Sequence, residues 1–233
     1  AIPPKRPAMR PDLAHIDAWL FDLDNTLYPG SADLFPQMNA RIGAYVARLL
    51  NLDPDTAHRV QKDYFISHGT TLAGLMADHG VDPYEYLADV HDIEMDVLEH
   101  NAPLAAAIAK LPGRKIVFTN ADAPYAEKVL DRLGIREHFE AIHDVHASSY
   151  HPKPHPHAYA SVCEAYRIDP KRALFVEDMA RNLTPAKALG MTTVWLDNGS
   201  ESGHRDHLPE HVDFHVNDIT DWLETLPQHW GNR

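Results

Sequence analysis

Two aspartates stand two residues apart, directly after a short apolar run near the start of the chain. They are Asp22 and Asp24 in the stretch FDLDNTLYP, residues 21–29, and the run before them is Ala18-Trp19-Leu20-Phe21. Carboxylates at such close spacing disfavour each other's ionisation unless a cation offsets their charge. The pair is therefore a candidate for catalysis or metal binding, to be weighed against a merely polar strand end.

Other apolar runs in the chain are also followed by polar residues that can bind or react. These further candidates are Thr119, Asn120, Glu177 and Asp178, together with Lys153 in the proline-rich stretch HPKPHP. Ligands of open α/β sheets bind outside the carboxyl ends of the strands. Converging strand ends would bring carboxylates, a hydroxyl and one lysine into a single crevice.

The residue types in this set favour one class of chemistry. Clustered carboxylates without thiol or histidine ligand spacing suit a hard cation, most naturally Mg²⁺. Asp22 and Asp178 are the expected side-chain ligands, and the backbone carbonyl of Asp24 can join them. Lys153 would add positive charge against a phosphate dianion, and Thr119 would hold a phosphate oxygen. One aspartate can attack phosphorus while a second transfers protons.

Elements of two kinds must position these residues. Short apolar runs that alternate with helical patterns predict βαβ units and a mainly parallel sheet. The predicted strands are Trp19–Leu23, Lys115–Phe118, Ala141–Asp144, Ala173–Val176, Thr192–Leu196 and an edge strand at Asp213–Val216. The helices predicted between and after them are Leu104–Leu111, Pro124–Leu133, His155–Tyr166, a short helix ending at Gly190, and Ile219–Leu226.

A helical insertion separates the first strand from the rest. Apolar residues recur at helical spacing from Phe35 to Leu49, and further helices are predicted at 56–66, 72–79 and 83–91. We therefore divide the chain into three parts. These are an N-terminal arm (1–14), an α/β core (15–30 and 101–233) and an all-helical cap (31–100).

Composition restricts the classes of partner. The formal net charge of −13 disfavours nucleic-acid polymers and anionic membranes, but it allows a small anion beside a local cation. No apolar run approaches the roughly 18 residues of a membrane span. The single cysteine, Cys163, permits no internal disulfide and suits a cytoplasmic location. The oligomeric state is not indicated.

Four ordered motifs resemble those of the haloacid dehalogenase-like (HAD) superfamily. They are FDLDNTLYP, FTNA, the lysine of KPHP and VEDMARN, which together span residues 21–182. The resemblance implies a three-layer Rossmann-like core with an inserted cap, and Mg²⁺ as cofactor. It makes Asp22 the nucleophile and Asp24 the general acid/base. The other implied roles are phosphate binding by Thr119, Asn120 and Lys153, metal binding by Asp22, Asp24 and Asp178, and supporting contacts by Glu177 and Asn182, the last at a position where many members carry aspartate.

The cap resembles a narrower group within that superfamily. The first motif and the cap stretch YFISHGTTLAGL, residues 64–75, are similar to the pyrimidine 5′-nucleotidases. Either a loop that faces the crevice or an ordinary interhelical turn fits this stretch. If it faces the crevice, the candidate substrate contacts are Tyr64, His68, Gly69, Thr70 and Thr71.

Taken together, these features predict a Mg²⁺-dependent phosphatase that hydrolyses a pyrimidine nucleoside 5′-monophosphate through an aspartyl-phosphate. FMN, pyridoxal phosphate or a sugar phosphate are alternative substrates. A haloacid dehalogenase, a phosphomutase and a non-catalytic binding protein are the competing functions.

Overall fold

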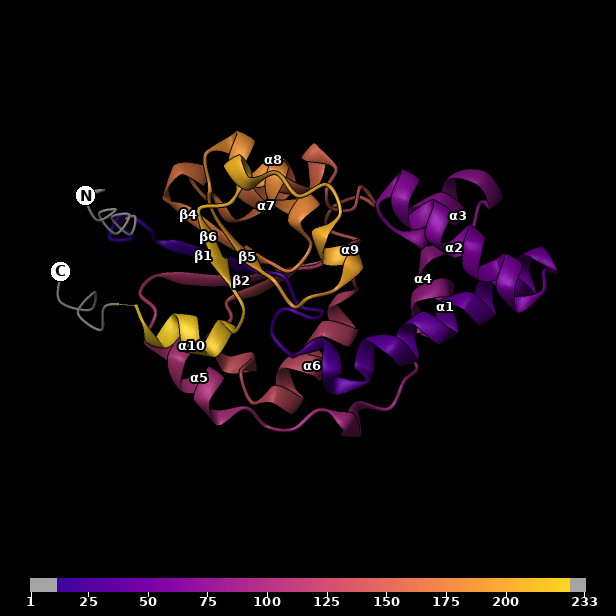
Figure 1. The fold of residues 1–233 in the computed structure, drawn as a ribbon, viewed down its shortest axis with the longest axis horizontal. Helices are drawn as coiled ribbons and strands as arrows, with labels where there is room; N and C mark the ends of the chain where they lie inside the picture. Colours follow the sequence, from indigo (N-terminus) through magenta and orange to yellow (C-terminus); the bar gives the residue numbers. More distant parts are fainter. Residues whose placement is uncertain (1–11, 227–233) are drawn as a thin grey trace, which may run out of the picture.

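A single parallel sheet forms the centre of the core. The computed structural model describes residues 12–226, and within them the strand order is β3-β2-β1-β4-β5-β6, with every pair of neighbours parallel (Figure 1). The strands are β1 (Ala18–Phe21), β2 (Arg114–Phe118), β3 (Ala141–His143), β4 (Ala173–Glu177), β5 (Thr192–Leu196) and β6 (Phe214–Val216). The predicted α/β core with a parallel sheet is confirmed, and β6 lies at the edge as expected.

The first strand is shorter than predicted. It ends at Phe21 rather than Leu23, because the chain turns back directly afterwards. The carbonyl of Leu23 accepts hydrogen bonds from the backbone N–H groups of Thr26 and Leu27. Asp22 still donates its own N–H to the carbonyl of Val176 in β4, so its side chain is fixed at the sheet edge.

Apolar side chains that alternate along the strands pack on helices at both faces of the sheet. Trp19 and Phe21 belong to the apolar cluster that includes α5 (Ala102–Ala109), α6 (Ala123–Leu133) and α10 (Ile219–Glu224). Ala18 and Leu20 point the other way, into the cluster with α7 (Pro156–Tyr166) and α8 (Leu183–Leu189). Figure 1 shows these two helical layers with the sheet between them. The side chains of β1 are therefore buried on both faces of the sheet. This agrees with its sequence, which has no polar face.

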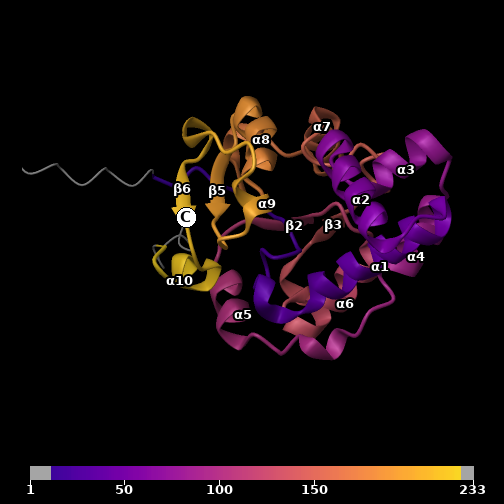
Figure 2. The same ribbon diagram turned by 45° about the vertical axis from the view of Figure 1, so that its right-hand side comes forward.

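Four helices form the inserted cap, to one side of the sheet (Figures 1 and 2). They are α1 (Leu34–Leu50), α2 (Pro54–His68), α3 (Thr71–His79) and α4 (Pro83–Val90). Helix α2 begins two residues before the predicted Thr56, because the Asp53 side chain accepts from the Thr56 N–H and Pro54 fits the first turn. Leu49, expected on the apolar face of α1, is 42% exposed.

Shorter helical turns complete the described chain. The four-residue helix α9 (Glu201–His204) was not predicted, because so short a segment carries no apolar periodicity. The 3-10 turns are Gly30–Ala32, Met95–Val97, Arg136–His138, Pro170–Arg172, Ala180–Asn182 and Pro209–His211. None of the helices between residues 12 and 226 is long and apolar enough to cross a membrane.

The cap and the core share apolar contacts. Val145, in the segment after β3, joins the buried cluster formed by α1 to α4, and Leu34 at the start of α1 joins the core cluster. The division at residues 30 and 101 stays a prediction. Most of the predicted arm, residues 1–11, lies outside the described part of the chain, and Leu13 is buried in the core.

Candidate active site

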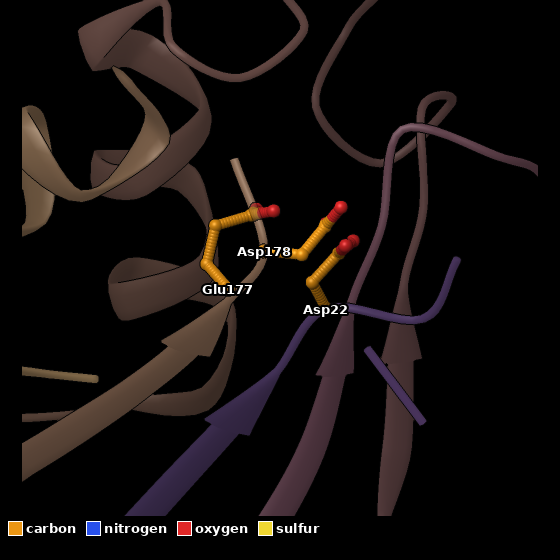
Figure 3. A group of neighbouring side chains, drawn as sticks. All are labelled: Asp22, Glu177 and Asp178. Atoms are coloured by element: carbon orange, nitrogen blue, oxygen red, sulfur yellow. The ribbon is translucent and has the colours of Figure 1, made fainter. Parts of the chain in front are cut away.

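Three carboxylates from two neighbouring strands meet at the carboxyl edge of the sheet. Asp22 follows β1, while Glu177 ends β4 and Asp178 follows it. Each offers one oxygen within 4.8 Å of the others, and all three side chains are buried. Figure 3 shows them converging beyond the strand ends. The parallel pairing of β1 with β4 places Phe21 beside Val176, so the sheet register itself brings the three residues together.

A buried lysine connects two of these carboxylates. The Lys153 ammonium donates to Asp22 Oδ1 at 2.7 Å and to Glu177 Oε2 at 2.9 Å. Its third hydrogen bond goes to the carbonyl of Phe118, the last residue of β2, at 2.8 Å. Lys153 is only 1% exposed, and all three of its N–H donors are used. The lysine of the proline-rich loop is thus fixed at the strand ends.

The charges at this edge do not cancel. Three carboxylates against one ammonium leave an excess of two negative charges when every group is ionised. Buried charges of one sign are unstable without a counter-ion. A hard divalent cation matches both the excess charge and the oxygen donors, so the residues present fit Mg²⁺.

The pKa values at the edge reflect this imbalance. Burial and the charge of Glu177 raise the pKa of Asp22 to about 7, although Lys153 opposes the shift. Burial, then the charges of Glu177 and Asp22, raise the pKa of Asp178 well above its usual range. Burial alone would raise the pKa of Glu177, but the Lys153 ammonium lowers it. Raised values at a shared site are typical of functional carboxylates.

Asp24 lies apart from this cluster. Its Oδ1 accepts hydrogen bonds from the hydroxyls of Tyr28 at 2.6 Å and Tyr125 at 2.7 Å. Burial raises the pKa of Asp24, while the two tyrosines partly counteract the rise. The two aspartates of the first motif therefore have different environments, as the resemblance implies. A metal contact through the Asp24 backbone carbonyl stays a prediction.

The polar residues after β2 hold the lysine loop in place. Asn120 pairs with the backbone of Lys153, accepting its N–H at 2.9 Å and donating to its carbonyl at 3.2 Å. Asp122, and not Asn120, is the N-cap of α6. Thr119 is 1% exposed, and its hydroxyl accepts from the Ala121 N–H at 3.0 Å. Phosphate binding by Thr119 and Asn120 stays a prediction.

Both carboxylate oxygens of Glu177 accept hydrogen bonds from protein donors. Oε2 accepts from Lys153 and from Asn182 Nδ2, the latter at 3.0 Å, and Oε1 accepts from the Met179 N–H at 3.0 Å. Asn182 therefore contacts the cluster through Glu177. Asp178 has fewer and longer contacts, from Asn198 at 3.1 Å and Thr26 at 3.4 Å. Of these two carboxylates, Asp178 is therefore less engaged by protein donors and more available to bind a metal ion.

The cap stretch YFISHGTTLAGL approaches the strand-end residues of the core at Gly69. Gly69 has φ +89°, and a Cβ there would lie 3.1 Å from the carbonyl oxygen of Lys153. From the core, Arg181 donates to the carbonyls of Phe65 and Gly69, both at 3.2 Å. These carbonyls belong to the C-terminal turn of α2, where they lack partners within the helix. Arg181 of the core therefore satisfies the C-terminus of a helix in the inserted module.

The other proposed cap contacts make hydrogen bonds inside the cap. Tyr64 donates to Asp78 at 2.8 Å, Thr70 accepts from the Ala73 N–H, and Thr71 donates to the Gln61 carbonyl at 3.1 Å. His68 is exposed, and its Nδ1 lies 2.7 Å from Ser67 Oγ. Contact of these side chains with a substrate stays a prediction.

Sequence reasoning missed three residues of the site. Tyr28 and Tyr125 on Asp24, and Arg181 between core and cap, were not among the candidates. Tyr28 and Arg181 lie inside the motifs FDLDNTLYP and VEDMARN, which was a usable signal. Tyr125 is 101 residues from Asp24 in sequence and gave none.

The sequence is similar to a family of hydrolases and to individual phosphate-metabolising proteins. The sequence pattern of a hydrolase family, the haloacid dehalogenase-like hydrolases, matches residues 16–190. Glyceraldehyde 3-phosphate phosphatase from Pyrococcus furiosus is 29% identical over 94% of this chain and 97% of that protein. Phosphate metabolism protein 8 from Saccharomyces cerevisiae is 25% identical over 93% of this chain and 68% of that protein.

A solved structure has a similar fold. A variant of CbbY from Rhodobacter sphaeroides, in complex with xylulose 1,5-bisphosphate, aligns with a TM-score of 0.62 and 18% identity. The alignment covers 88% of this chain and 96% of that one, so it includes both the sheet and the cap helices.

Proposed function

We propose that this chain, which belongs to the haloacid dehalogenase-like hydrolase family, is a Mg²⁺-dependent phosphatase of small phosphate monoesters. One observation carries the proposal. A buried edge of three carboxylates and one ammonium, Asp22, Glu177, Asp178 and Lys153, carries two excess negative charges when ionised and lies beside a separately held carboxylate, Asp24. The two carboxylates of the first motif thereby have the different environments that a nucleophile and a proton donor need.

The chain's own residues supply both half-reactions. The Asp22 carboxylate attacks phosphorus, and the bond from phosphorus to the ester oxygen breaks with its electron pair on that oxygen. Asp24 donates a proton to the departing oxygen. In the second half, Asp24 takes a proton from water as the water oxygen bonds to phosphorus. The aspartyl-phosphate bond then breaks, which releases phosphate and restores the Asp22 carboxylate.

Lys153 and the metal ligands control the charge around Asp22 and the phosphoryl group. Asp22 and Asp178, with the carbonyl of Asp24, would hold Mg²⁺, which supplies positive charge against the phosphoryl oxygens and favours ionised Asp22 when bound. Lys153 keeps Asp22 oriented through the 2.7 Å hydrogen bond, and Asn120 fixes the loop that carries Lys153. Thr119 and backbone N–H groups near the start of α6 hold the remaining phosphate oxygens.

For the substrate, we propose a pyrimidine nucleoside 5′-monophosphate, on the likeness of FDLDNTLYP and the cap stretch 64–75 to that nucleotidase group. The relative named for glyceraldehyde 3-phosphate favours a short sugar phosphate as the second candidate. FMN and pyridoxal phosphate remain in the test panel. The net charge of −13 supports a small metabolite, not a nucleic-acid polymer or a membrane, and we keep a cytoplasmic location as part of the proposal.

Dehalogenation is the competing reaction on the same fold. It requires neither a cation nor a second acid, whereas this chain has an acidic cluster with excess negative charge and a hydrogen-bonded Asp24. Without a cation a haloacid anion would enter that field unfavourably, whereas a phosphate ester would enter it beside Mg²⁺. These contacts support phosphoryl transfer, and release of free phosphate separates a phosphatase from a phosphomutase.

The test is a phosphate-release panel with Mg²⁺ over nucleoside monophosphates, FMN, pyridoxal phosphate and sugar phosphates. UMP and CMP leading the ranking would support the nucleotide proposal, and a sugar phosphate leading would replace it. Chelation is expected to abolish turnover, and Asp22→Asn to lower kcat by about 10⁴-fold or more. Full activity of Asp22→Asn, or of chelated protein, would contradict the mechanism, as would a panel without any turnover. Leu49→Ala, an exposed cap position, is the control.

A further inference from the structure

Two tyrosine hydroxyls converge on a single oxygen of Asp24. Tyr28 and Tyr125 both donate to Oδ1, at 2.6 and 2.7 Å, and their own hydroxyl oxygens are 3.4 Å apart. Among residues 12–226, no side chain or backbone group donates to Oδ2 of Asp24. The carboxyl group is thus held by one oxygen while the other is left for reaction.

Both tyrosines are built rigidly into the core. Each is only 2% exposed, and each belongs to the apolar cluster under the sheet. Burial, followed by the charge of Asp24, raises both tyrosine pKa values well above the ordinary range, so both hydroxyls stay protonated donors. They come from different elements, the loop after β1 and the first turn of α6, so Asp24 is fixed from two directions.

A cap residue holds the ring of Tyr125. His91, which ends α4, stacks on Tyr125 with 4.3 Å between ring centroids and 13° between planes. Its Nδ1 lies 2.9 Å from Asp122 Oδ1, and Asp122 also accepts the backbone N–H of Tyr125 at 3.2 Å. His91 therefore contacts both the ring of Tyr125 and the carboxylate that caps its helix.

We propose that Tyr28 and Tyr125 are positioning residues for the proton-transfer step: by holding Oδ1 they turn Oδ2 of Asp24 toward the leaving-group oxygen. The inference rests on the proposed phosphatase function and extends it to residues that do not touch the phosphate. In the first half-reaction the proton on Oδ2 passes to the ester oxygen as its bond to phosphorus breaks. In the second half Oδ2 recovers a proton from the attacking water.

The competing interpretation is that the hydroxyls only satisfy a buried carboxylate. The two interpretations differ in how a loss depends on the leaving group. Protonation matters greatly for an alkoxide leaving group and little for p-nitrophenolate, which leaves without help. The second half-reaction is the same for both esters, so the comparison uses kcat/KM, which reports the steps up to departure of the leaving group. Loss of acid positioning lowers kcat/KM for the alkyl ester selectively, whereas general distortion of the site lowers it for both ester types alike.

The experiment compares Tyr28→Phe, Tyr125→Phe and the double variant with wild type, Asp24→Asn and Tyr86→Phe. Tyr86 is a matched control, a buried cap tyrosine outside the site. Two substrates are assayed in the presence of Mg²⁺. They are p-nitrophenyl phosphate and the alkyl monoester that ranks first in the panel. In the double variant we expect kcat/KM for the alkyl ester to fall by about tenfold or more and kcat/KM for p-nitrophenyl phosphate by less than about threefold. KM is expected to change little.

Several outcomes would overturn the inference. Equal losses on both esters, or no loss on either, would assign the tyrosines a structural role or none. A wild type that cleaves neither ester overturns the proposed function itself, and this inference with it. Asp24→Asn without selectivity for the alkyl ester removes the acid role of Asp24 and again the inference. Thermal unfolding checks each variant, and the single variants carry the test if the double variant does not fold.

Discussion

At the carboxyl ends of β1 and β4 the buried side chains are charged, whereas the buried side chains of the cap are uncharged. Asp22, Glu177, Asp178 and Lys153 are all less than 8% exposed. The cap keeps its charges outside, as in the pairs that Arg41 and Arg48 form with Asp89. The core tolerates an electrostatically unfavourable edge because the sheet and two helical layers hold it. The smaller cap combines apolar packing with hydrogen bonds and buries no charged side chain.

The largest expected effect comes from removing the central ammonium. Lys153→Met leaves the buried carboxylates without their cation, and we expect the free energy of unfolding at neutral pH to fall by about 3–5 kcal/mol. Denaturant unfolding measures this. Lys187→Met is the matched control, since that lysine forms an exposed pair with Asp213, and its loss is expected to stay within about 1 kcal/mol. Equal losses would remove the distinction between buried and exposed pairs.

A packing change in the cap is expected to lower the free energy of unfolding somewhat less, and to loosen the cap helices, not the sheet. Leu75 is 0% exposed in the cap cluster, and Leu75→Ala is expected to cost about 3 kcal/mol. Hydrogen exchange would show lost protection in α1 to α4 and retained protection in β1 and β4. Leu49→Ala, 42% exposed on the same module, is expected to change stability by less than about 0.5 kcal/mol. Equal loss of protection in β1 would show that cap and core unfold together.

The smallest expected effect is a pH dependence of the metal-free protein. The pKa of Asp22 is raised from 3.8 to about 7 in the folded chain. Between these values the folded state binds a proton that the unfolded state lacks, so stability falls as pH rises through about 7, by at most about 1.4 kcal/mol per pH unit. The stability of wild type relative to Asp22→Asn is therefore expected to decline from pH 5 to pH 8. Saturating Mg²⁺ would reverse the decline, and a flat difference would contradict the raised pKa.

The sequence predicted the strand ends well, because buried parallel strands are apolar and their polar ends are conspicuous. It placed Asp22, Glu177 and Asp178 at the edge where the structure brings them together. It failed where partners are remote or elements short. Tyr125 meets Asp24 only through the packing of α6, which brings together residues 101 apart in the sequence.

The turn Ala180–Asn182 joins the catalytic edge to the cap through neighbouring side chains. Arg181 donates to the end of α2, and Asn182 donates to Glu177. Because the two residues are adjacent in one tight turn, a shift of that turn would move both contacts. Coupling of this kind acts equally in both directions. If closure of the cap changes cation binding at the edge, a bound cation changes closure by the same factor.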